Sequence, residues 1–145
     1  APGRSNRGTG ACLLRLMQMD VDSFCIAFER HYLIPIYPGR NRDGDKFPAR
    51  LVREGVERMS KIMAGRIVVL VGKKVACAFG IDHVAPFEWV QHEVGESMVS
   101  TMAWIPNPCG MNTWWNDPEN KQAGEAFLVA LGQRAFDLSL RGLAA

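Results

Sequence analysis

The residues with the clearest potential for binding or chemistry lie in one loop, from Ile105 to Pro118. The sequence there holds three prolines, three asparagines, one glycine and two adjacent tryptophans. Tryptophans in a polar loop that prolines hold rigid need a surface or a ligand to cover them. The loop follows an apolar run and precedes a helical pattern, and open α/β sheets bind ligands in such loops. The sequence therefore predicts that this is the working loop.

The two tryptophans of this loop, Trp114 and Trp115, have two possible roles. They either flank a bound ligand or dock inward and anchor the loop, because bulky aromatic residues at a loop-to-helix junction often pack against the core. Asp117 precedes Pro118 at the expected helix start, so helix capping is the role that its position favours.

A second candidate for binding is the glycine-rich, basic segment that opens the chain. Gly3, Gly8 and Gly10 allow tight turns that direct backbone N–H groups toward the N-terminus of the helix expected from Gly10 to Met19. Such N–H groups suit a phosphate or another anion. The alternative is that these glycines only form a turn.

The charge distribution is compatible with a polyanionic partner. The whole chain carries a net charge of +2, but residues 1–80 hold 14 Lys and Arg against 7 Asp and Glu, and residues 81–145 hold 3 against 8. A basic face for nucleic acid would explain this asymmetry. Two solvated surfaces that differ in charge would explain it equally well.

The elements that must position these residues alternate between helix and strand. Apolar periodicity predicts helices over residues 10–19, 20–30, 48–64, 73–79 and 118–140, and strands over residues 31–37, 66–72, 87–94 and 98–105. Residues 38–46 are predicted to be a long polar, basic loop, and residues 95–96 a hairpin turn. The pattern predicts a single α/β domain over residues 1–145, a three-layer α/β/α sandwich with a mainly parallel central sheet of about four strands.

Four segments, in this order, resemble the motifs of the uracil-DNA glycosylase superfamily. They are Ala1-Pro2-Gly3 with the glycine-rich turn, Leu33–Arg42 with its Pro-Gly-Arg-Asn-Arg end, Val68–Ala76 with Gly72, and Ile105–Asn112 with Asn-Pro-Cys-Gly. The closest pattern is the Gly-Glu-Ala-Pro-Gly version of the bacterial and archaeal branch. The resemblance implies an enzyme of DNA repair that flips a modified or deaminated base out of DNA and hydrolyses its N-glycosidic bond.

The resemblance also assigns site residues. The catalytic residue is Asn107, the base pocket is Ala1, Pro2, Gly3, His31 and Tyr32, and the DNA-binding residues are Arg4, Arg7, Arg40, Arg42, Lys46, Cys109, Gly110, Met111 and Asn112. Asn107 would stabilise the leaving base, and Met111 or Asn112 would open the duplex. The basic residues would contact phosphates.

The chain departs from the family at several positions. The last-motif His is replaced by Asn107, an amide that donates a hydrogen bond but carries no charge. The residue expected to orient water is not present in the chain, and neither is the central strand that carries it. Three functions therefore stay open: a glycosylase, a catalytically silent nucleic-acid-binding or adaptor module on the same fold, and a nucleotide or sugar-phosphate enzyme.

Composition and residue spacing bear on membrane spans, disulfides and metal sites. No apolar run has the length of a membrane span and no signal peptide is visible, so we expect a cytoplasmic monomer that binds DNA and not membranes. The four cysteines (Cys12, Cys25, Cys77 and Cys109) are widely spaced, and buried free thiols are expected rather than disulfides or an iron–sulfur cluster. His83 and His92 lack metal-binding spacing, so no cofactor or metal is predicted.

Overall fold

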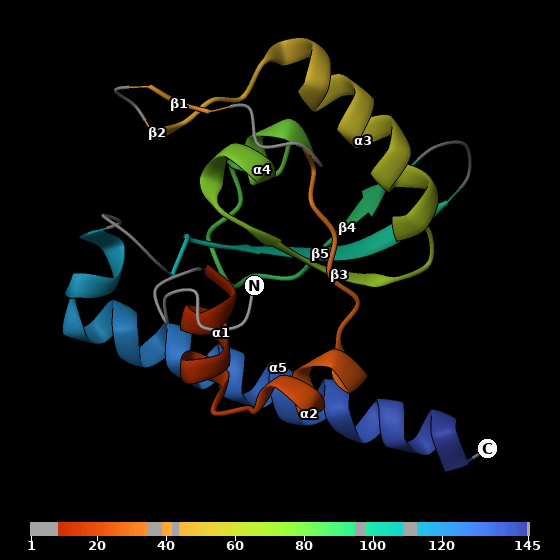
Figure 1. The fold of residues 1–145 in the computed structure, drawn as a ribbon, viewed down its shortest axis with the longest axis vertical. Helices are drawn as coiled ribbons and strands as arrows, with labels where there is room; N and C mark the ends of the chain where they lie inside the picture. Colours follow the sequence, from red (N-terminus) through yellow and green to blue (C-terminus); the bar gives the residue numbers. More distant parts are fainter. Residues whose placement is uncertain (1–8, 35–38, 42–43, 95–97, 109–112, 145) are drawn as a thin grey trace. The chain divides into compact units, whose positions relative to one another are not determined.

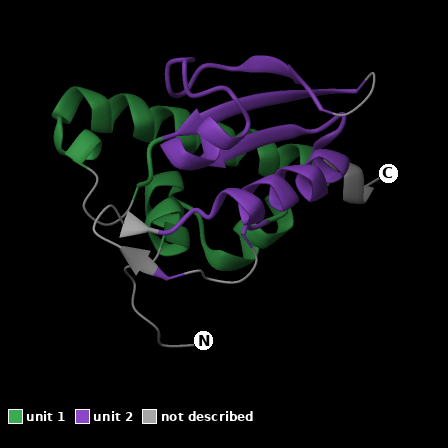
Figure 2. Cartoon of the chain, turned by 90° about the horizontal axis from the view of Figure 1, so that it is seen from above, with its two compact units in different colours: residues 1–30, 106–145 green, residues 31–105 purple. Residues whose placement is uncertain are grey.

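The chain has an α/β fold, and the computed structural model describes residues 9–34, 39–41, 44–94, 98–108 and 113–144 of it (Figure 1). It divides into two compact units, which Figure 2 shows in different colours. The first unit joins the two ends of the sequence, residues 1–30 and 106–145, and the second unit is residues 31–105. The single domain expected over residues 1–145 stays a prediction.

The second unit is organised around a three-stranded sheet with the strand order β3-β5-β4. Its strands are β3 (Ile67–Val71), β4 (Val90–Glu93) and β5 (Val99–Ile105). Strands β3 and β5 are parallel, with Val69 opposite Ala103, while β4 and β5 are antiparallel, with Gln91 opposite Thr101.

The predicted positions of these three strands are confirmed, but the prediction of about four mainly parallel strands is wrong for the described residues. Only one of the two strand pairs in this sheet is parallel. The connection from β4 to β5 spans just residues 94–98. A parallel connection needs a crossover of a dozen residues or more, so a connection of this length is compatible only with an antiparallel pair.

The core of the second unit lies on the sheet face that carries Leu70, Met102 and Trp104. The helices α3 (Ala49–Met63) and α4 (Lys73–Ala78) cover this face. The side chains of α3 that face the core recur every three to four residues, as an amphipathic helix requires. The buried members of the cluster are Leu33, Met59, Met63, Leu70, Ala76, Phe79, Ile81, Met102 and Trp104.

The strand predicted over residues 31–37 is wrong for its described part, because residues 31–34 belong to no strand. The cause is Arg58 on α3, whose Nη2 donates to the carbonyl oxygens of Tyr32 at 3.0 Å and Leu33 at 2.9 Å. These carbonyls would otherwise be available to a strand ladder. Gly55 lets the segment approach, because a Cβ there would collide with the Leu33 carbonyl group.

The basic segment after residue 38 is a short hairpin rather than the predicted long loop. Strands β1 (Arg40–Asn41) and β2 (Gly44–Asp45) pair in antiparallel fashion, with Arg40 opposite Asp45. The N–H of Lys46 then donates to the carbonyl of Gly39 at 2.9 Å and closes the base of the hairpin. Gly39 has a φ of 98°, which glycine adopts without strain and which lets the chain enter this turn.

The first unit consists of helices α1 (Thr9–Met17), α2 (Val21–Ala27) and α5 (Pro118–Ala144) with the short 3-10 helix η1 (Thr113–Asn116). Helices α1 and α2 and η1 all contact α5. The cap predicted at Asp117 is confirmed, and Asp20 caps α2 in the same way. Asp20 accepts the N–H of Ser23 at 2.7 Å, and Asp117 accepts the N–H groups of Glu119 at 2.9 Å and Asn120 at 3.3 Å. The hydrogen bonds from Ser23 lower the pKa of Asp20.

The turn between α1 and α2 predicts a stabilising substitution. The N–H of Met19 donates to the Leu14 carbonyl and the N–H of Gln18 to the Arg15 carbonyl, which is the Schellman pattern. Gln18 therefore has a φ of 55°, a conformation that favours glycine. We expect Gln18→Gly to raise the free energy of unfolding by about 0.5–1 kcal/mol. Urea denaturation measures this, and an unchanged or lower midpoint would contradict the assignment.

The cysteine prediction is confirmed at one position and wrong at two. Cys12 is buried in α1, whereas Cys25 and Cys77 are exposed, and these three are free thiols. Cys25 is exposed because the short helix α2 has no buried residue. The apolar sequence around Cys25 was therefore a poor guide to its burial. In the described parts of the chain, no helix has the length and hydropathy to cross a membrane.

Candidate functional site

The working loop predicted from the sequence leaves the second unit at the end of β5 and enters the first unit at Pro106. Pro106 is buried, whereas Asn107, the predicted catalytic residue, is exposed. The indole Nε1 of Trp115 donates to the Pro106 carbonyl at 3.3 Å. This hydrogen bond joins Pro106 to Trp115, so the described residues on the two sides of the loop lie close together within the first unit.

The two tryptophans hold this loop against α5. Their rings meet edge to face, with centroids 4.8 Å apart and an interplanar angle of 77°. Both are partly buried, and Asn120 on α5 donates from Nδ2 to the Trp114 carbonyl at 3.1 Å. Contacts of this kind match the anchoring alternative for Trp114 and Trp115, in which they fix the loop and do not themselves bind a ligand.

Asn107 lies next to the N-terminus of α1. The hydroxyl of Thr9, the first residue of that helix, donates to Oδ1 of Asn107 over a long 3.5 Å contact. The contact directs Oδ1 of the amide toward α1. The end of the glycine-rich segment and the start of the last loop are thus adjacent within the first unit.

Arg30 brings a positive charge to the same helix terminus. Its guanidinium lies over Gly10, where a Cβ would meet Nη1 at 2.8 Å and Cζ at 3.3 Å. Helix N-termini carry partial positive charge and exposed N–H groups, so the added guanidinium strengthens the preference for an anion. Sequence reasoning missed Arg30, since nothing in its local sequence indicates that it packs on a glycine 20 positions earlier.

The structure places three other predicted site residues in the second unit. His31, Tyr32 and Lys46 are all exposed, and Tyr32 retains 60% of its accessible surface. The backbone of the His31–Leu33 segment is held by Arg58, and the backbone of Lys46 closes the hairpin of β1 and β2. Asn107 belongs to the first unit, so a joint site of Asn107 with His31 and Tyr32 stays a prediction.

A second basic residue near the hairpin was also missed. Lys74 on α4 lies over the ring of Phe47, with its Nζ 5.3 Å from the ring centroid. Phe47 directly follows Lys46, so the second unit carries two lysines beside the hairpin that starts with Arg40. Because both lysine side chains are exposed, the pair can contact an anionic backbone.

Most of the other predicted site residues lie outside the described residues. For Arg40 only the backbone pairing in β1 is described. The residues outside the description are Ala1, Pro2, Gly3, Arg4, Arg7, Arg42, Cys109, Gly110, Met111 and Asn112. Their roles in base binding and DNA binding stay predictions.

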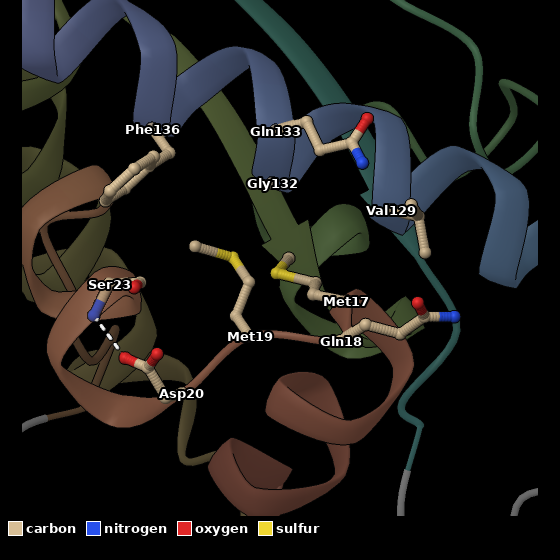
Figure 3. A pocket seen from close by; sticks show the side chains of 9 residues that line it. All are labelled: Met17, Gln18, Met19, Asp20, Ser23, Val129, Gly132, Gln133 and Phe136. Atoms are coloured by element: carbon tan, nitrogen blue, oxygen red, sulfur yellow. Dashed lines mark hydrogen bonds between the residues drawn. The ribbon is translucent and has the colours of Figure 1, made fainter.

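The first unit also has an open cavity of about 210 Å³ between the α1–α2 turn and α5 (Figure 3). In Figure 3, Met17 and Met19 point toward α5, where Gly132 and Phe136 face them. Gly132 permits this approach, because a Cβ there would meet Sδ of Met19 at 2.8 Å. None of the predicted site residues lines this cavity, so it is separate from Asn107.

Comparison with known proteins adds no assignment. No family model, no curated protein and no solved structure matches this chain. Within the described residues, no three His, Cys, Asp or Glu side chains come together as metal ligands would. Functional inference therefore depends on the contacts around Asn107 and on the motifs in the sequence.

Proposed function

We propose that this chain is a divergent member of the uracil-DNA glycosylase superfamily and removes a modified or deaminated base from DNA. The observation that carries the proposal is the contact between Thr9 and Asn107. It joins the end of the first motif segment to the start of the last, and the superfamily resemblance requires these two segments to meet at the flipped nucleotide.

The chemistry of Asn107 is compatible with this role. Breaking an N-glycosidic bond leaves developing negative charge on the departing base, which a hydrogen-bond donor stabilises. The side-chain amide of Asn107 has an Nδ2 group that donates hydrogen bonds, and this is the group that we assign to the leaving base. An uncharged amide stabilises this charge less than a histidinium would, so we expect slow turnover.

Phosphate binding has two candidate locations, one in each unit. In the first unit, Arg30 lies at the N-terminus of α1. In the second unit, Lys46 and Lys74 accompany the hairpin. DNA binding should weaken linearly with the logarithm of salt concentration, and Arg30→Ala should reduce the magnitude of that slope by about one. Arg134 on α5 is a matched exposed arginine of the first unit, and Arg134→Ala should leave the slope unchanged.

The activity itself is tested with duplexes that contain uracil, hypoxanthine or a hydroxymethylated pyrimidine, followed by alkaline cleavage of abasic sites. We expect Asn107→Ala to reduce kcat by about 100-fold, because it removes one transition-state hydrogen bond. Asn116→Ala, which changes an exposed asparagine of η1, is the control that should retain full activity.

The second candidate is a DNA-binding module without catalysis, and the uncharged Asn107 favours it. It predicts the same salt-dependent DNA binding but no abasic product from any duplex. Asn107→Ala would then leave DNA affinity nearly unchanged. Absence of both binding and product would count against both candidates.

A further inference from the structure

Trp115 holds the peptide group that connects Pro106 to Asn107. Its indole Nε1 donates to the Pro106 carbonyl at 3.3 Å. That carbonyl lies in the same planar peptide group as the backbone N–H of Asn107, because rotation about a peptide bond is strongly hindered. The indole therefore restrains the backbone from which the Asn107 side chain projects.

Two contacts fix the Trp115 indole within the first unit. The ring of Trp114 meets it edge to face, with centroids 4.8 Å apart. Asn120 on α5 donates from Nδ2 to the Trp114 carbonyl at 3.1 Å, and this carbonyl lies in the peptide group that connects Trp114 to Trp115. Both tryptophans belong to η1, which contacts α5. The long helix α5 thus determines where the indole donor points.

The residues on the two sides of this peptide group differ in burial. Pro106 is buried and Trp115 is partly buried, whereas Asn107 is exposed. Packing restrains an exposed side chain less than a buried one, so the backbone that carries Asn107 contributes more to the direction of its amide. A fixed backbone next to an exposed amide is the arrangement that a preorganised hydrogen-bond donor requires.

We propose that Trp115 is a positioning residue that sets the direction of the Asn107 amide. The inference rests on the proposed function, because this amide is the group that we assign to the leaving base. A donor held in its productive direction lowers the reaction barrier, and a misplacement of about 1 Å can cost about 100-fold in rate. Trp115 thus does more than anchor the loop, and it acts without touching the DNA.

Trp115→Phe tests the proposal with the full 145-residue chain, because it keeps a ring beside Trp114 and removes the indole N–H. On a duplex that yields abasic product, we expect kcat to fall about tenfold and KM to stay within about twofold. A tryptophan that contacted the bound nucleotide would instead raise KM. Trp89→Phe changes an exposed tryptophan of the second unit, and this control should keep both constants.

The double variant Asn107→Ala, Trp115→Phe shows whether the tryptophan acts through the asparagine. If it does, Trp115→Phe lowers kcat no further once the Asn107 amide is absent. A tryptophan that only stabilised the fold would lower kcat by the same factor in both backgrounds, and that result would overturn the proposal. An unchanged kcat or a raised KM in the single variant Trp115→Phe would also overturn it. Near-UV circular dichroism checks that each variant is folded under the assay conditions.

A measurement without DNA separates this proposal from the proposed function. In ¹⁵N–¹H NMR spectra, Trp115→Phe should shift the signals of the backbone N–H and the Nδ2 group of Asn107. The Trp115 indole proton of the parent chain should exchange with solvent more slowly than that of a short tryptophan peptide. If no duplex yields abasic product, the proposed function fails, and these spectra alone decide whether Trp115 sets the direction of Asn107. Unchanged Asn107 signals or an unprotected indole proton would show that it does not.

Discussion

Replacing Gly55 by alanine is expected to destabilise the second unit by about 3 kcal/mol or more, because the new methyl group collides with backbone. A Cβ at Gly55 would overlap the Leu33 carbonyl oxygen and would meet Cδ1 of Leu33 at 2.9 Å. Gly55 is buried in the middle of α3, and the nearest atom to the new Cβ is a backbone oxygen, which no side-chain rotation can move away. The segment must therefore shift, and with it the two carbonyls that accept from Arg58.

Gly132→Ala is the matched control for Gly55→Ala, since both glycines lie inside helices and both gain helix propensity as alanine. The Cβ at Gly132 would contact Sδ of Met19, part of a flexible side chain that can change rotamer. Urea denaturation should thus show a much larger loss for Gly55→Ala than for Gly132→Ala. Equal midpoints would mean that the approach of Leu33 to α3 is not tight.

The close approach at Gly55 also shows why residues 31–34 were not predictable. Their apolar pattern and the following proline indicate a strand, and a local reading has no reason to reject one. The competing partner is Arg58, a residue 25 positions after Leu33 in the chain. Hydrogen bonds between residues so far apart in the sequence are tertiary contacts, and here they override the local preference of residues 31–34 for a strand.

Features set by local sequence were predicted correctly. Strand β3 follows from an uninterrupted apolar run and β5 from a mostly apolar run, and Asp117 precedes its helix as a capping residue does. The position of Arg30 over Gly10 was not foreseeable, because it depends on how the chain returns after α2. The candidate site also combines a local and a tertiary feature. The motif in the sequence identified Asn107, whereas its contact with Thr9 is known only from the structure.

The second large effect is expected at Trp104, which joins the sheet to the segment between α4 and β4. Its indole Nε1 donates to the Val84 carbonyl at 2.7 Å, and its own carbonyl accepts the N–H of Phe87 at 3.0 Å. Trp104 is 7% exposed and belongs to the main core cluster. Trp104→Ala should lower the free energy of unfolding by about 3–5 kcal/mol, because it leaves a cavity the size of an indole.

Trp104→Phe separates the packing from the hydrogen bond. Phenylalanine retains most of the apolar contact but leaves the Val84 carbonyl without the indole donor, which should cost about 1–3 kcal/mol. Hydrogen exchange should then show faster opening of the amide of Phe87, whose φ of 68° is held in place by its bond to Trp104. If Trp104→Phe were as stable as the parent chain, the indole would act by volume alone, and residues 84–87 would have to be fixed by other contacts.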